Sequence, residues 1–524
     1  MKTRFSIIIL LTTAQIFAKT WFVDPQSGSP DGDGSALKPW YTLQQVIDSG
    51  LVQCLEGEKY PYKWGMPLCI KNQGAPVKGG DTLILNTGYH GAVFISRCYN
   101  ENYITVMANK NHYPRLKNIR LLAASKWRFI GLKISPEYAQ PFEKVTLFSI
   151  ESHNNSGPAR EIEVLACTLF SASNISKWTK DDWNNLSCNG FSVRSNRCLI
   201  SNNTLRNVNF GISVDGDSCL IENNIVENFA GDGLRGVGDY CRFSHNTIMN
   251  CYAVNQNHDD GFQSWSVGDS GVGTGVVKGI VLSGNIFINY TDPDQPFRGT
   301  LQGIGCFDGF FEDWVIENNV VITDHWHGIT LLGARNCRII NNTVCDLNSQ
   351  KPGPPWIKIG KHKNGSSSSG CLIRNNLSTS ISIEDSQSVE SDHNVKIDDP
   401  YRFFADYDHL DLQLKTGCPA IDAAISDKAP SVDIRGTARP LGNGVDAGAF
   451  EYNSISPVLH KKDQSGKLMA QQYRLSFLGQ TIRSDKMMVP FFQLNGQIVN
   501  CRPGTRGHLP WKTVVSKEMV DKEQ

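Results

Sequence analysis

Three carboxyl groups stand at matching points of two neighbouring segments. Asp232 in AGDGLRG and Asp260 in NHDDGFQSW each directly precede a glycine and a short apolar stretch, and Asp259 adjoins Asp260. Arg235 and His258 flank them. Grouped carboxylates can hold a hard cation such as Ca²⁺, or one can act as an acid while another acts as a base. We therefore take these residues as the centre of a candidate site.

A repeat surrounds this centre. CLISNN, CLIENN, CRFSHN, CRIINN and CLIRNN each begin with Cys and end with Asn, and IVLSGN and WVIENN are copies without the cysteine. The final asparagines are Asn203, Asn224, Asn246, Asn285, Asn319, Asn342 and Asn376. The short steps give a unit of about 22 residues, and a period near twenty is typical of a solenoid. Without the fixed leucines of leucine-rich repeats, the repeat favours a parallel β-helix.

Stacking of like residues then predicts two columns. The asparagines tolerate left-handed backbone, and their amides can hydrogen-bond from coil to coil. The repeat cysteines form an inward column of packing thiols rather than disulfides. They are Cys198, Cys219, Cys241, Cys337 and Cys371.

A second strand precedes each copy of the repeat, beginning with Gly and then an apolar residue. Because side chains alternate along a strand, the residue after the apolar one points outward. This outward column is Ser192, Ser213, Arg235, Gln263, Gly305, Thr330 and Lys358. Successive coils lie about 4.8 Å apart, so Asp232 and Asp260 should be near each other.

The net charge and the N-terminal segment indicate which partners to expect and where the protein acts. The formal net charge is zero, which gives no electrostatic reason to expect nucleic acid. Residues 1–18 carry a basic head and a short apolar run, which predicts a secretory signal peptide. We expect a secreted or periplasmic protein with no membrane span, a monomer, and one disulfide between Cys54 and Cys69.

The segments before and after the repeat both resemble one family. TWFVDPQSGSPDGDGSALKPWYTLQQVID and GCPAIDAA with DIRGTARPLGNGVDAGAFEY resemble the opening and closing patterns of secreted, carbohydrate-active right-handed parallel β-helix proteins. The resemblance implies an all-β solenoid over residues 19–452, with an N-terminal capping helix. Residues 453–524 form a C-terminal extension of unknown role. This fold hosts lyases, hydrolases, epimerases and adhesins.

The leading hypothesis is a lyase that cleaves an acidic, uronate-containing polysaccharide by β-elimination. Asp232, Asp259 and Asp260 would hold Ca²⁺ to neutralise the substrate carboxylate, and the candidate bases are Arg235, His258 and Lys358.

Three alternatives remain open. Polygalacturonase-like inverting hydrolases use an Asp, an Asp pair, a Gly-His-Gly and a later Lys, which Asp232, Asp259–Asp260, His327 and Lys358 match in part. Mannuronan C5-epimerases use Asp-Pro-His-Asp, of which His258–Asp259 matches the second half. The third alternative is a non-catalytic carbohydrate-binding or adhesion protein.

Substrate-binding candidates lie along the same face. Sugar rings stack on aromatic side chains, and Gln263 offers a polar contact. The aromatic candidates are Trp265, Phe307, Trp326 and Trp356. Long insertions at 266–279, 290–300 and 349–356 interrupt the regular coils near the charged strands, which predicts a walled binding site.

Overall fold

The computed structural model describes residues 18–453. The predicted signal peptide (except residue 18) and the predicted C-terminal extension (except residue 453) lie outside the described residues, so both stay predictions. Among the described residues, no helix combines the length and apolar character needed to cross a bilayer.

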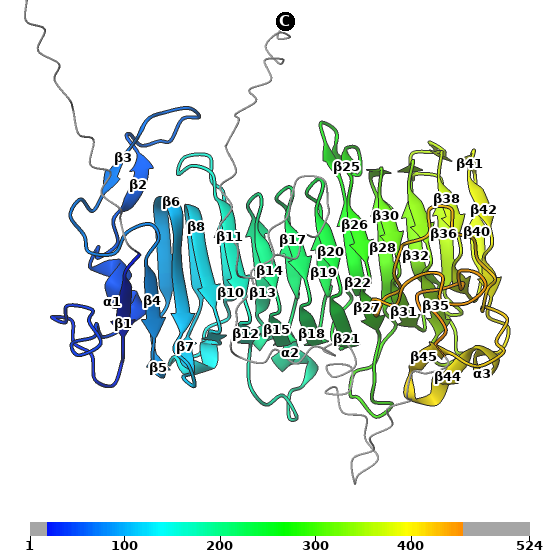
Figure 1. Cartoon of the computed structure of the whole chain (residues 1–524), viewed down its shortest axis with the longest axis horizontal. Coiled ribbons are helices and arrows are strands. Elements are labelled where there is room, and N and C mark those ends of the chain that lie inside the picture. Colours follow the sequence, from blue (N-terminus) through cyan, green and yellow to red (C-terminus); the bar gives the residue numbers. More distant parts are fainter. Residues whose placement is uncertain (1–17, 454–524) are drawn as a thin grey trace, which may run out of the picture. The chain divides into compact units, whose positions relative to one another are not determined.

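The described chain is a right-handed parallel β-helix (Figure 1). After the first coils, each coil contributes one strand to each of three faces. The first face stacks β10 (Thr146–Glu151), β13 (Asn189–Arg194), β16 (Ile212–Val214), β19 (Leu234–Gly236), β22 (Asp260–Trp265), β28 (Gln302–Asp308), β32 (His327–Leu332), β36 (Trp356–Gly360) and β40 (Ile381–Ile383). The second face stacks β11 (Arg160–Leu165), β14 (Leu199–Ser201), β17 (Leu220–Glu222), β20 (Arg242–Ser244), β26 (Val281–Ser283), β30 (Val315–Glu317), β34 (Arg338–Ile340), β38 (Leu372–Arg374) and β42 (Glu390–Asp392).

The third face follows the asparagine of each repeat. Its strands are β5 (Gly88–Tyr89), β7 (Pro114–Leu116), β9 (Lys133–Ile134), β12 (Thr168–Phe170), β15 (Thr204–Val208), β18 (Ile225–Phe229), β21 (Thr247–Cys251), β27 (Ile286–Ile288), β31 (Val320–Thr323), β35 (Thr343–Asp346), β39 (Leu377–Ser378) and β43 (Val395–Lys396). Short strands widen the corner between the first and second faces in the later coils. They are β25 (Val276–Lys278), β29 (Phe310–Glu312), β33 (Ala334–Arg335), β37 (Ser368–Ser369) and β41 (Ser386–Gln387).

The first coils are built from longer strands. β1 (Thr20–Val23) pairs with β4 (Thr82–Leu85), which pairs with β6 (Val93–Ala108). β6 and β8 (Ile119–Ile130) run through both the first and second faces, since β8 pairs with β10 near its start and with β11 near its end. Helix α1 (Leu43–Asp48) buries Leu43 and Val46 at the N-terminal end, which confirms the predicted capping helix.

The asparagine column is a hydrogen-bonded ladder. Each buried ladder side chain donates its Nδ2 to the Oδ1 of the next, as Asn224 does to Asn246 at 3.0 Å. The ladder continues to Asn394, one coil beyond the predicted copies. The left-handed backbone lies one residue earlier, at positions such as Asn202, whose φ is 58°. The prediction of left-handed ladder residues was therefore wrong, because the sharp turn is made before the ladder residue.

The cysteine column is confirmed, and the predicted disulfide is wrong. The five repeat cysteines are free and buried. The described chain has its disulfide between Cys54 and Cys98, whereas Cys69 is free and exposed. β2 (Cys54–Gly57) and β3 (Leu68–Lys71) pair so that Cys54 lies opposite Lys71, with Cys69 two residues away. Such diagonal neighbours are about 7–8 Å apart, too far for a disulfide.

The remaining elements are short. The hairpin strands are β23 (Val267–Gly268) with β24 (Gly271–Val272), and β44 (Phe404–Asp406) with β45 (Asp411–Leu414). The helical segments are α2 (Lys180–Leu186), α3 (Pro400–Phe403), η1 (Pro136–Tyr138) and η2 (Tyr407–His409).

Candidate functional site

The outward column of the first face forms in the predicted register. Ser192, Ser213, Arg235 and Gln263 are neighbours on successive strands, followed by Gly305, Thr330 and Lys358. The apolar residues before them are Phe191, Ile212, Leu234, Phe262, Ile304, Ile329 and Ile357, each 0–1% exposed. Inward packing thus directs this column outward, where Gly305 and Thr330 are covered by neighbouring groups and the other five members are partly exposed.

Asp232 and Arg235 form the first pair of the site. Asp232 is buried, and its Oδ2 accepts a hydrogen bond from Arg235 Nε. Its Oδ1 accepts from the Asp260 backbone N–H at 3.1 Å. The guanidinium lies over the Phe210 ring, 3.7 Å from its centroid, and within 5.5 Å of the Trp265 ring centroid. Burial raises the pKa of Asp232, and Arg235 opposes that rise.

Asp260 lies beside this pair and is fully buried. Its Oδ2 accepts from Gln263 Nε2 at 3.0 Å, and its Oδ1 has no hydrogen-bond partner. The carboxyl group fills the space above Gly305, where a Cβ would overlap it and also approach the Phe307 ring. Burial, and then the nearby charge of Asp232, raises the pKa of Asp260 well above its usual range.

Asp259 is also buried, with one carboxyl oxygen lacking a partner. Cys251 of the third face is close enough to lower the pKa of this carboxyl group, which opposes the effect of burial. Burial raises the pKa of Asp259 to about 7, with a smaller contribution from Asp232. Asp259 therefore titrates near neutral pH.

The three carboxyl groups do not form a common ligand set for calcium. Asp232 is paired with Arg235, and Asp259 contacts Cys251. Within residues 18–453, no group of three or more His, Cys, Asp or Glu side chains is arranged to hold a metal ion. Calcium prefers six to eight oxygen ligands, and the cation of Arg235 already holds Asp232.

Aromatic and histidine side chains continue the site across the next two coils. His327 lies edge-on to Phe307 and Trp356, with ring centroids 4.8 and 5.4 Å away. Its Nδ1 lies 3.0 Å from Thr330 Oγ1. Burial, His325 and Lys358 lower the pKa of His327 to about 4, so this ring is neutral at pH 7.

Two tryptophans form a platform at the end of this group. The rings of Trp326 and Trp356 are stacked with an angle of 15° and a centroid distance of 6.3 Å. Trp326 is 43% exposed. Lys358 Nζ lies 4.9 Å from the Trp356 ring centroid and 2.7 Å from Glu384 Oε2.

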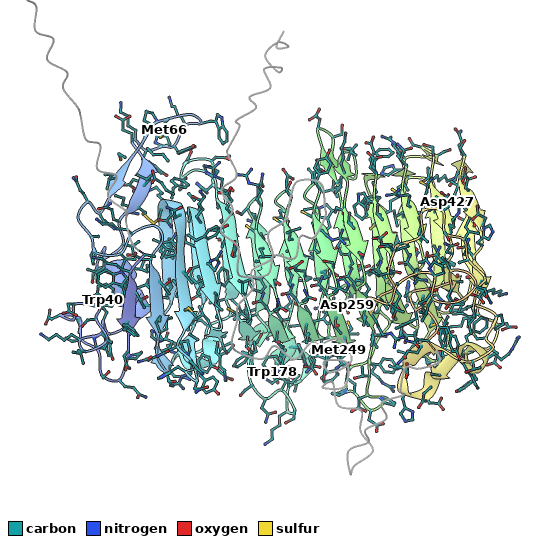
Figure 2. All side chains as sticks on the ribbon, viewed as in Figure 1. Trp40, Met66, Trp178, Met249, Asp259 and Asp427 are labelled. Carbon is teal, nitrogen blue, oxygen red and sulfur yellow. A yellow bond between two sulfur atoms is a disulfide. The ribbon has the colours of Figure 1, made fainter. Side chains whose placement is uncertain are left out.

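The loop that carries the Asp pair is anchored by α2. Trp183 of α2 stacks on Tyr252 with ring centroids 4.5 Å apart, and Phe297 packs against the same cluster. Asn184 Nδ2 donates to the Val254 carbonyl at 3.4 Å, and Asn184 Oδ1 accepts from Asn255 Nδ2 at 2.9 Å. Figure 2 labels Asp259 in the middle of the described chain, between Trp40 towards one end and Asp427 towards the other.

Most predicted site residues therefore gather in two neighbouring groups. One group holds Asp232, Arg235, Asp259, Asp260, Gln263 and Trp265, and the other holds Phe307, Trp326, His327, Trp356 and Lys358. His258 is exposed, and it lies close enough to His325, beside the second group, to contribute to the lowered pKa of that ring, which is due mainly to burial.

The sequence analysis missed four participants: Phe210, Gln302, His325 and Glu384. Gln302 lies beside Asp260 in the strand register and has a buried amide oxygen without a partner. Position along the repeat would have identified Gln302 and Phe210, which precede the strand glycines as Asp232 and Asp260 do, whereas the contacts of His325 and Glu384 depend on side-chain direction.

One family model agrees with the fold. The family described as right-handed beta helix region matches residues 186–349. No curated protein matches the chain by sequence. A solved structure of pectate lyase Pel9A is 13% identical, with a TM-score of 0.42, over 83% of this chain and 96% of that one. An exopolygalacturonase from Thermotoga maritima is 11% identical, with a TM-score of 0.35, over 60% and 84%. A mannuronan C-5 epimerase A-module from Azotobacter vinelandii is 12% identical, with a TM-score of 0.30, over 61% and 88%.

Proposed function

We propose that the protein is a carbohydrate-active enzyme that hydrolyses glycosidic bonds of a polysaccharide bound along the first face. The observation that carries the proposal is the contrast between Asp232 and Asp260. Arg235 and a backbone N–H favour the charged form of Asp232. Asp260 has one amide donor and complete burial, which favour its protonated form.

This contrast assigns the two roles of glycoside hydrolysis. The protonated carboxyl group of Asp260 donates its proton to the glycosidic oxygen as the bond to the leaving sugar breaks. Burial raises the pKa of Asp232 too, but Arg235 opposes that rise, so Asp232 is the one of the pair that ionises first. Its carboxylate accepts a proton from the attacking water or stabilises the positive charge that develops on the sugar ring. Two carboxyl groups whose environments push their pKa values apart are the usual arrangement for this chemistry.

Substrate has to uncover Asp260, because its carboxyl group is out of contact with solvent. The Phe307 ring is the side chain that closes over Gly305 next to that carboxyl group. Rotation of Phe307 as a sugar ring binds would therefore open the site. The Trp326–Trp356 platform, one and two coils farther along, would hold the neighbouring sugars.

A lyase that acts by β-elimination is the second candidate, and His327 is the observation that favours it. Its ring is neutral at pH 7 and lies next to Trp356, where it can accept a proton from a bound sugar. The two activities differ in their products, since only elimination leaves an unsaturated sugar end that absorbs ultraviolet light.

The test is a panel of polysaccharides incubated with wild type, with Asp260→Asn and with the matched control Asp31→Asn, which changes an exposed carboxyl group. We expect new reducing ends without ultraviolet absorbance, lost in Asp260→Asn and kept in Asp31→Asn. Reducing ends that form equally with Asp260→Asn would overturn the assignment of the acid. Ultraviolet absorbance that disappears in His327→Gln would establish the lyase instead. We expect the protein to act outside the cytoplasm, on the basis of the predicted signal peptide.

A further inference from the structure

We infer that the first face takes an uncharged polysaccharide rather than a polyuronate. The inference deepens the proposed function, and it rests on a polysaccharide binding to this face. It departs from the acidic substrate that the sequence analysis favoured, for an electrostatic reason visible in the described residues.

Each cation of the outward column is already neutralised. From Ser149 to Ser382 the column contains two cationic residues, Arg235 and Lys358. Arg235 is bound to buried Asp232, and Lys358 is bound to Glu384 at 2.7 Å. Each cation already balances the charge of its own carboxylate, so neither brings an uncompensated positive charge to a substrate carboxylate.

The walls of the site show the same balance. The insertions at 266–279, 290–300 and 349–356 contain three acidic and three basic residues. Lys278 pairs with Glu312 at 3.8 Å, and Arg298 lies over the Tyr290 ring, 5.0 Å from its centroid. Lys351 donates to the Gly353 carbonyl at 3.5 Å. The neighbouring loop adds Lys361 and Lys363, paired with Asp385 at 2.8 Å and Asp308 at 2.5 Å.

A polyuronate brings one negative charge for each sugar. Removing a carboxylate from water without a cationic partner costs free energy, and breaking an existing buried pair to supply a partner costs more. The exposed Trp326 and the stacked Trp356 instead offer apolar rings. The C–H faces of an uncharged sugar pack on such rings without loss of an ion pair.

The experiment compares chains that differ only in charge. Mannan, cellulose and galactan oligosaccharides are each prepared in native form and with the primary alcohols oxidised to carboxylates. Binding to the full chain carrying Asp260→Asn is followed by quenching of tryptophan fluorescence at low and high NaCl. We expect at least one uncharged chain to bind, with a Kd at least tenfold lower than that of its oxidised form and little changed by salt.

Two further variants locate the binding. Trp326→Ala should raise the Kd of the uncharged chain about tenfold, whereas Trp64→Ala, at an 84% exposed tryptophan between β2 and β3, should leave it unchanged. Tighter binding of an oxidised chain, weakened by NaCl, would overturn the inference. Failure of every uncharged chain to bind would overturn it as well. A chain that binds to wild type without being cleaved would refute the hydrolase proposal alone.

Discussion

Replacement of Asp259 by Asn tests the electrostatics of the site through stability. The pKa of this buried carboxyl group is raised from 3.8 to about 7. An acid whose folded pKa exceeds its unfolded value binds more protons when folded, so stability is greatest below pH 3.8 and falls as pH rises toward 7. At about 1.4 kcal/mol for each pH unit, the wild type loses roughly 4 kcal/mol across this window through Asp259.

The Asn variant cannot ionise and avoids this loss. We therefore expect the free energy of unfolding of Asp259→Asn, measured by urea denaturation from pH 4 to pH 8, to rise relative to wild type by about 3–4 kcal/mol. The exposed Asp31→Asn should follow the wild-type curve. Parallel curves for wild type and Asp259→Asn would refute the reasoning, because they would mean that Asp259 ionises without cost. Calcium that stabilises the wild type at high pH, and so reduces the difference between wild type and Asp259→Asn, would revive the metal-site hypothesis.

The remaining predictions concern the acid Asp260, the Phe307 ring beside it, Trp183 in the helix that anchors the loop, and the need for a metal ion. Asp260→Asn should lower kcat by about 10²–10⁴-fold, measured by reducing ends, while the variant unfolds at neutral pH at a temperature no lower than wild type, since the amide keeps the shape of a protonated carboxyl group and cannot ionise. Phe307→Ala should hydrate Asp260 and lower its pKa, which moves the alkaline limb of the pH–rate profile to lower pH; an unmoved limb would contradict the role of the ring as a cover. Trp183→Ala should cost about 3–5 kcal/mol and raise proteolysis of the loop at 252–259, read by mass spectrometry. A chelator should leave activity unchanged, and loss of activity restored by Ca²⁺ would show that the carboxyl groups rearrange around an ion.

The solenoid could be predicted because stacking repeats one physical requirement on every coil. Each coil needs a buried amide that donates to the next, and the chain meets this need with Asn at one position. The copy ending in Asn394 escaped detection, because its step is 18 residues and its segment VESDHN has Val in place of the cysteine. The pairing of Cys54 with Cys98 lay beyond the pattern too, since it belongs to the irregular first coils.

The candidate site could be predicted only as far as the strand register reaches. The alternation of side chains placed Arg235, Gln263 and Lys358 in one column, and the register confirms it. The ion pairs were not predictable in the same way. Glu384 reaches Lys358 from a strand end one coil farther along. These pairs neutralise the cations of the column, and the uncharged polymer inferred above rests on them. The acidic polymer expected from the sequence stays a prediction.

The burial of Asp232, Asp259 and Asp260 in neighbouring coils is better explained by a function than by packing. The coils next to the site place Phe210 and Gln302 at the position that Asp232 and Asp260 occupy, so the fold tolerates uncharged residues there. Asp259 and Asp260 each leave a buried carboxyl oxygen without a partner, and both have raised pKa values. Such groups destabilise the folded state, and Asn at either position would remove the ionisable group while keeping a similar shape. They occur in the coils where α2 anchors the loop and where the insertions flank the first face. Two adjacent buried acids, each with one carboxyl oxygen without a partner, are what a proton-transfer site requires and what packing alone gives no physical reason to keep.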